Sequence, residues 1–81
     1  MSTSKVSIRQ VKAARALLAW SQGQLATASG LSLPTVKRLE AIDGDLGGKP
    51  GTAAQITAAL ESAGVIFVGE NGEGAGVRLK K

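Results

Sequence analysis

Apolar side chains recur at intervals of three and four residues in several parts of the chain, a spacing typical of amphipathic α-helices. The first such series contains Ile8, Val11, Ala14, Leu17, Leu18 and Trp20. Ser7 and Gln10, at its start, form the S-x-x-Q pattern of a capping box. The pattern predicts a helix that ends at Trp20, and this lone aromatic residue is expected to fill the core rather than to stack on bases.

Residues 21–42 have the pattern of two short helices joined by a tight turn. Ser21 and Gln24 form a second capping box, which predicts a helix over residues 22–29. Gly30 is placed to end this helix, because a residue without a Cβ adopts the left-handed conformation at little cost. Ser32 is placed to cap the next helix, with Pro34 in the first turn, where a missing N–H costs little. The expected shared core is Leu25, Ala26, Leu31, Val36 and Leu39, and Ile42 continues the apolar series.

Residues 43–51 form a loop by composition. Asp43 and Asp45 resemble part of a calcium loop, but the later acidic ligands are missing, so no metal site is expected. Thr52 and Gln55 then make a third capping box. The apolar series that follows predicts a helix that closes the core and ends at Gly64; it consists of Ala53, Ile56, Ala59, Leu60 and Ala63.

The pattern changes from that of a helix to that of strands after Gly64. Residues 65–68 are apolar and mostly β-branched, residues 70–74 are turn formers, and residues 76–79 can return, which predicts a β-hairpin. A lone hairpin is marginally stable, so it must pack on the helices or pair with the same element of a second subunit. We favour a dimer interface formed by Val65, Ile66, Phe67, Val68, Val77 and Leu79.

Composition limits the chemistry that the chain can perform. Its 81 residues make one domain, with a helical part over residues 6–64 and a hairpin over residues 65–81. Cysteine, histidine and tyrosine are absent, which excludes thiolate and imidazole metal sites and the common nucleophile–base pairs. We therefore expect neither an enzyme nor a cofactor. The longest apolar run, residues 16–20, is too short to span a bilayer, and the N-terminus lacks an apolar signal core, so a cytoplasmic protein is expected.

The distribution of charge favours a polyanionic partner. Ten basic and six acidic residues give a net charge of +4. Six of the cations lie on or before the helix pair: Lys5, Arg9, Lys12, Arg15, Lys37 and Arg38. Arg9, Lys12 and Arg15 share one side of the first helix, where they form either a solvated face or phosphate contacts.

The second helix of the pair is expected to present Thr35, Lys37 and Arg38, with Leu33 and Pro34 at its start, on a face that does not pack in the core. These side chains suit a DNA major groove. Arginine bonds bidentately to guanine, threonine and leucine contact the thymine methyl group, and lysine neutralises phosphate. Glu40 is expected to pair with Lys37 or Arg38, or to support the next loop.

A resemblance to a known family follows from the run Gln22-x-x-Leu25-Ala26-x-x-x-Gly30-x-x-x-x-x-Val36-x-x-Leu39-Glu40. This run is similar to the Xre type of helix-turn-helix, the family of the phage Cro and cI repressors. The resemblance implies a compact helical domain that binds DNA, usually as a dimer on a near-palindromic operator. It also implies that Gln22 bonds a phosphate and buttresses the recognition helix, and that the following loop, with Lys49, runs along the DNA backbone.

The sequence thus predicts a mostly α fold, namely a compact four- to five-helix, repressor-like helix-turn-helix domain with a C-terminal β-hairpin. We expect a bacterial or phage transcriptional regulator, a repressor that binds an inverted-repeat operator as a homodimer and associates with the nucleoid. The expected DNA-binding residues are Gln22, Ser32, Leu33, Pro34, Thr35, Lys37 and Arg38, with phosphate contacts at Arg9, Lys12, Arg15 and Lys49. Two alternatives remain: an antitoxin with a second small protein as partner, or an architectural or recombination-directing DNA-binding protein.

Overall fold

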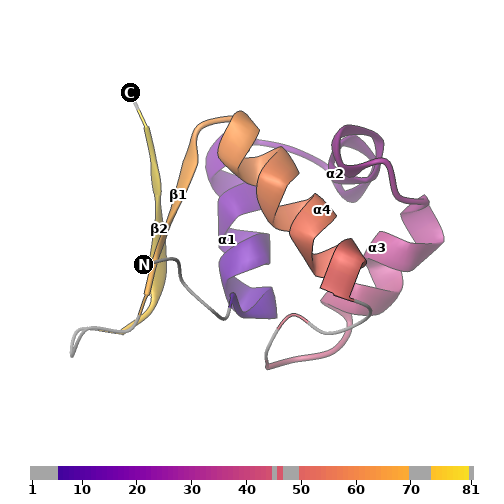
Figure 1. The fold of residues 1–81 in the computed structure, drawn as a ribbon, viewed down its shortest axis with the longest axis horizontal. Coiled ribbons are helices and arrows are strands. Elements are labelled where there is room, and N and C mark those ends of the chain that lie inside the picture. Colours follow the sequence, from indigo (N-terminus) through magenta and orange to yellow (C-terminus); the bar gives the residue numbers. More distant parts are fainter. Residues whose placement is uncertain (1–5, 45, 47–49, 70–73, 81) are drawn as a thin grey trace.

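Four α-helices are followed by a two-stranded antiparallel hairpin in the computed structural model, which describes residues 6–44, 46, 50–69 and 74–80 (Figure 1). The elements are α1 (Ile8–Leu18), α2 (Gln22–Ser29), α3 (Leu33–Glu40), α4 (Pro50–Ser62), β1 (Val65–Val68) and β2 (Gly76–Leu79). The predicted mostly helical fold with a C-terminal hairpin is confirmed. None of the helices in the described ranges is both long and apolar enough to cross a lipid bilayer.

Local hydrogen bonds fix the starts of the first two helices. Ser7 Oγ accepts a bond from the Gln10 backbone N–H at 3.1 Å, and the Ser7 N–H donates to Gln10 Oε1 at 2.9 Å. Ser21 and Gln24 repeat this arrangement at 3.1 and 2.8 Å. Both predicted capping boxes are therefore confirmed, because each needs only two residues three positions apart.

The ends of α1 and α2 both use a left-handed residue. Gly30 follows α2 with φ 77°, as predicted. Ala19 follows α1 with φ 58° and ψ 36°, and it is the one non-glycine residue with positive φ in the part of the chain that the structure describes. The helix thus ends at Leu18, two residues before the predicted end at Trp20. Trp20 is half-buried and packs against the core.

The core draws on every helix and on the first strand. Its buried apolar residues are Ile8, Val11, Ala14, Leu25, Ala26, Val36, Leu39, Ile56, Leu60 and Val65. The expected core of the α2–α3 pair is confirmed, with Leu31 only partly buried. Two residues that were assigned to apolar faces are exposed: Leu17 by 44% and Ile42 by 58%. Their spacing fits a helix face, but they lie beyond the area that the neighbouring elements cover.

The fourth helix begins earlier than predicted. Its first residue is Pro50, so Thr52 lies inside α4 and the predicted capping box of Thr52 and Gln55 is wrong. The Gln55 side chain instead donates to the Ser29 carbonyl at 3.0 Å, which ties α4 to the end of α2. Lys49, a predicted phosphate contact, lies outside the described residues.

The hairpin packs on the helices of its own chain. Strands β1 and β2 pair with Val65 opposite Leu79 and Phe67 opposite Val77, which confirms the predicted strands. The hairpin lies at one end of the molecule against α1, on the side away from α3 (Figure 1). Gln10 of α1 donates to the carbonyls of Val68 at 3.2 Å and Gly76 at 2.9 Å. Packing within the chain therefore exists, and the dimer role stays a prediction.

Candidate nucleic-acid interface

Helices α2 and α3 pack against each other and are joined by a short turn. Leu31 anchors this turn, because its N–H donates to the Ala26 carbonyl at 3.0 Å. Helix α3 lies at the end of the molecule that is opposite to the hairpin (Figure 1). Its surface is thus not covered by the described sheet.

The faces of α3 differ in chemistry. Its buried residues are Val36, Leu39 and Glu40. Its exposed residues are Leu33, Pro34, Lys37 and Arg38, whereas Thr35 is half-buried. The structure therefore brings the predicted DNA-binding residues of α3 to one surface.

The hydroxyl groups at the start of α3 have partners within the helix cap. Ser32 Oγ accepts a bond from the Thr35 N–H at 3.3 Å and lies 2.8 Å from Thr35 Oγ1. These contacts confirm Ser32 as the predicted cap and hold Thr35 in place. Pro34 occupies the first turn without loss, because the N–H that it lacks would have no partner within the helix.

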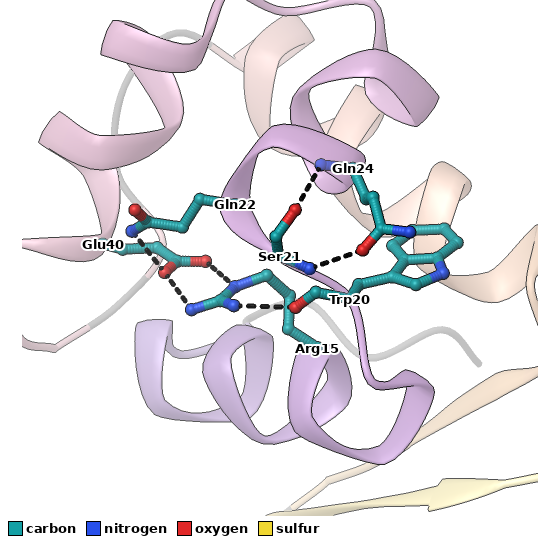
Figure 2. Close-up of polar contacts among 6 residues, drawn as sticks. All are labelled: Arg15, Trp20, Ser21, Gln22, Gln24 and Glu40. Atoms are coloured by element: carbon teal, nitrogen blue, oxygen red, sulfur yellow. Dashed lines mark hydrogen bonds and ion pairs between the residues drawn. The ribbon is translucent and has the colours of Figure 1, made fainter.

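A buried ion pair holds α3 against α1 (Figure 2). Arg15 donates from Nε to Glu40 Oε2 at 2.8 Å and from Nη2 to Glu40 Oε1 at 2.7 Å. A third bond runs from Arg15 Nη1 to the Trp20 carbonyl at 2.9 Å. Gln22 Nε2 donates to Glu40 Oε1 at 2.9 Å, so one carboxylate joins α1, α2 and α3.

The Glu40 carboxylate remains ionised in this setting. Burial raises its pKa, because only 4% of the residue is exposed. Hydrogen bonds from Arg15 and Gln22, together with the charge of Arg15, lower the pKa by more, so that the net shift is downward. A charged Glu40 therefore keeps the orientation of α3 fixed at neutral pH.

The partners of Glu40 correct the sequence prediction. The sequence predicts that Glu40 pairs with Lys37 or Arg38, or supports the next loop. In the structure Glu40 lies on the buried side of α3, where it faces α1 and pairs with Arg15. The expected buttressing role of Gln22 agrees with its bond to Glu40, while its phosphate contact stays a prediction. Arg15 was expected to reach phosphate, but its guanidinium is directed inward and its side chain is only 20% exposed.

A second ion pair joins α1 to the segment after α3, on the surface. Arg9 donates to Asp43 Oδ1 at 3.0 Å and to Oδ2 at 2.8 Å. The hydrogen bond from Arg9, and then one from the Gly44 backbone, lower the pKa of Asp43. Both side chains are well exposed, so phosphate could replace Asp43 as the partner of Arg9 at low cost.

The cations near α3 therefore fall into two groups. Arg9 and Arg15 have acidic partners. Lys12, Lys37 and Arg38 are exposed and have no ion-pair partner among the residues that the structure describes. The sequence could not show this division, because the paired residues are 34 and 25 positions apart.

An uncharged hollow lies between α2 and α4. It has a volume of about 490 Å³ and is lined by Trp20, Ala28, Ser29, Gln55, Ala58, Ala59, Ser62 and Ala63. It contains no nucleophile–base pair. No set of three or more acidic side chains that could hold a metal occurs in the described ranges.

Comparisons with known proteins leave the geometry as the main guide to function. No protein-family model matches the chain, and no curated protein matches its sequence. The described structure is a mostly helical domain with a C-terminal hairpin, in which a basic helix is held at the surface by a buried carboxylate.

Proposed function

We propose that this chain is a sequence-specific DNA-binding transcriptional regulator, a repressor that acts as a dimer on an inverted-repeat operator. The observation that carries the proposal is the exposed face of α3, where Lys37 and Arg38 have no acidic partner among the residues that the structure describes. An eight-residue helix fits a major groove, which is about 12 Å wide. The similarity of residues 22–40 to the Xre type of helix-turn-helix supports the same conclusion.

The attachment of α3 suits the reading of bases. Direct readout needs side chains held in a fixed geometry, which a well-supported helix supplies. Glu40, bonded to Arg15 and Gln22 (Figure 2), fixes the end of α3. Ser32 fixes its start. In this proposal Arg38 bonds guanine and Lys37 contacts guanine or phosphate.

Cations on α1 extend the basic surface beside α3. Arg9 meets Asp43 just after α3, and the charge of Lys12 lowers the pKa of both Asp43 and Glu40. The contact between Arg9 and Asp43 brings this side of α1 to the segment that follows α3. Phosphate contacts there supply affinity for any sequence, whereas α3 supplies the choice of sequence.

The hairpin offers the surface for a second copy. The Lys80 N–H donates to the Gly64 carbonyl at 2.7 Å, so these two residues form a hydrogen-bonded pair of the antiparallel ladder. Such pairs alternate along the strands, so the backbone N–H and C=O groups of Val77 and Leu79 point away from β1. No further strand covers this edge in the described part of the chain. Ile66 and Leu79 are also exposed, by 41% and 39%. Pairing of two β2 edges would produce the two-fold symmetry that an inverted repeat requires.

Selection from random duplex DNA tests the proposal. We expect the purified protein to retain an inverted repeat whose half-sites are centred about 10 base pairs apart. Arg38→Ala should weaken binding to that site by about 1–3 kcal/mol. Lys80→Ala is the control, because it removes one positive charge at an exposed position after β2, outside the strands that are proposed to pair. Retention without a consensus, or equal losses for both variants, would contradict the proposal and favour an architectural protein.

The second candidate is an antitoxin that binds a small protein partner as well as its own operator. The uncharged hollow between α2 and α4, with Trp20 at its edge, favours this alternative. Affinity purification from the native cell would separate the two. A stoichiometric small protein that is lost in a Trp20→Ala variant would support the antitoxin.

A further inference from the structure

The outer edge of β2 has hydrogen-bonding groups at alternate residues. Val77 and Leu79 direct their backbone N–H and C=O groups away from β1, whereas those of Gly76 and Arg78 face β1. Ala75 directly precedes β2 and continues the outward series. In the part of the chain that the structure describes, no third strand pairs with this edge. An antiparallel strand added here would therefore bond to Ala75, Val77 and Leu79.

The size of the side chains along this edge makes it complementary to itself. Ala75 and Gly76 are small, Arg78 and Leu79 are large, and Val77 lies between the two pairs. When two identical strands run antiparallel, residues at equal distances before and after the centre lie opposite each other. A second copy centred on Val77 thus places Ala75 opposite Leu79 and Gly76 opposite Arg78. Each large side chain then has a small residue as its neighbour across the pair.

Charge favours the same register. A register centred on Arg78 would place the Arg78 side chains of the two copies directly opposite each other. One centred on Leu79 would place Arg78 opposite Lys80. Like charges at opposed positions destabilise a strand pair. The register centred on Val77 avoids this repulsion. A register centred on Gly76 avoids it as well, but it places Leu79 beyond the small residues of the second copy.

We propose that two copies of this chain pair their β2 edges in the antiparallel register centred on Val77, so that Val77 of each copy lies at the two-fold axis. This inference rests on the proposed function and specifies how its dimer is built. The hydrogen-bonded ladder between the copies then runs from Ala75 to Leu79 and uses every outward residue of the edge.

The symmetry of this pair places both α3 helices on one side of the dimer. Val65, Phe67 and Val77 pack on the core, so this face of the hairpin is turned toward the helices. The two-fold axis of an antiparallel strand pair is perpendicular to the sheet, so the same face is turned to the same side in both copies. Helix α3 lies at the end of each copy that is opposite to the hairpin (Figure 1). Both α3 helices can therefore approach one face of a duplex.

Single cysteines report the register, because the chain has no cysteine of its own. Opposed residues of a hydrogen-bonded pair have Cα atoms about 5.5 Å apart, which a disulfide can span. We expect oxidation to join Leu79→Cys to Ala75→Cys chains, and Val77→Cys chains to each other. Leu79→Cys should form no disulfide alone or with Val77→Cys. Tags of different mass distinguish mixed from unmixed dimers, and all these variants keep Arg78.

Charge at Gly76 tests the register through the strength of the dimer. No atom lies within 4 Å of a Cβ added at Gly76, so a side chain fits there. Gly76→Glu places a carboxylate opposite Arg78 of the second copy, whereas Gly76→Lys places a like charge there. Analytical ultracentrifugation should give a dissociation constant of the dimer at least about fivefold lower for Gly76→Glu than for Gly76→Lys. Arg78→Ala, added to both variants, is the control for net charge and should remove most of this difference.

The results that would overturn the inference are distinct from a failure of the proposed function. A disulfide in Leu79→Cys alone, a disulfide between Leu79→Cys and Val77→Cys, or none in any mixture would show that the register is wrong. If random duplex DNA still yields an inverted repeat in that case, the proposed function stands with another interface. If the expected disulfides form but no sequence is retained from the DNA pool, the dimer is correct and the proposed function fails.

Discussion

The two members of the buried ion pair are not equivalent at the scale of single residues. Arg15 is 20% exposed along its side chain, so it can reach water when its partner is lost. Glu40 is 4% exposed and keeps only Gln22 when Arg15 is lost. A buried charge without its counter-ion is the more costly of the two situations.

We therefore predict that Arg15→Met destabilises the fold more than Glu40→Gln. The first change should lower the free energy of unfolding by about 3 kcal/mol or more, because it leaves a buried carboxylate. The second should lower it by about 1–2 kcal/mol, since glutamine keeps the shape of the side chain. Urea denaturation at neutral pH measures both values. Equal losses would contradict the unequal burial of the two side chains as the cause.

Acid should destabilise the protein through the same carboxylate. The pKa of Glu40 is lower in the folded state than in the unfolded chain, so its contribution is present above the unfolded pKa and is lost as the pH falls through the folded pKa. We predict a constant urea midpoint above about pH 5 and a decline below it. Glu40→Gln should flatten this decline.

Asp43→Asn provides the control for the acid titration. Arg9 also lowers the pKa of Asp43, so the sign is the same, but this pair is exposed and is screened by salt. The Asp43 contribution should therefore disappear at high salt, whereas that of Glu40 should persist. A decline that is unchanged in Glu40→Gln would assign acid sensitivity to other carboxylates.

At the scale of the elements, α1 and α2 end in the same left-handed conformation with different residues. Gly30 adopts φ 77° without strain. Ala19 adopts φ 58° although its Cβ then lies close to the following carbonyl oxygen, which costs free energy. We predict that Ala19→Gly raises the free energy of unfolding by about 1 kcal/mol and that Gly30→Ala lowers it by about as much. Thermal unfolding of both variants would show opposite shifts of the midpoint. Shifts of the same sign would mean that contacts, not backbone strain, decide these positions.

The two capping boxes also allow a matched comparison. Gln10 caps α1 and donates to Val68 and Gly76 of the hairpin, whereas Gln24 caps α2 and is exposed. We predict that Gln10→Glu costs about 2–3 kcal/mol, because a carboxylate cannot donate to the two carbonyls. Gln24→Glu should stabilise by about 0.3–1 kcal/mol, since it keeps the box and adds a negative charge at a helix start. Denaturant unfolding distinguishes these outcomes. A similar effect of both changes on the free energy of unfolding would show that the bonds from Gln10 to the hairpin do not stabilise the fold.

Local patterns predicted the elements well but could not predict how they face one another. The boxes at Ser7 and Ser21 were found because their bonds span three residues. The same spacing of Thr52 and Gln55 gave a wrong helix start, because it also occurs inside a helix that has already begun at Pro50. The partner of Glu40 is 25 residues away, and only the packing of α1 on α3 brings Arg15 to it.

At the scale of the whole molecule, ion pairing reduces the number of cations that are free to contact an anionic partner. Lys12, Lys37 and Arg38 have no acidic partner in the described part of the chain, although the net charge is +4. If Lys12 contacts phosphate, Lys12→Ala should make the slope of log affinity against log salt shallower by about 0.9 per protomer. Titrations at several salt concentrations measure this slope. Lys80→Ala is the control, and an equal change in that variant would mean that the effect reflects net charge alone.

The bonds from Gln10 to Val68 and to Gly76 join positions that are 58 and 66 residues apart in the chain. Helix α1 is synthesised before β2, yet β2 completes the buried side of α1. The contacts between α1 and β2 thus join residues that are far apart in the sequence. The formation of such contacts has a large cost in loop-closure entropy. During synthesis α2 and α3 are present well before the hairpin that completes the core. A nascent chain can consequently form its helices early, but it reaches its final packing only after residue 79 has left the ribosome.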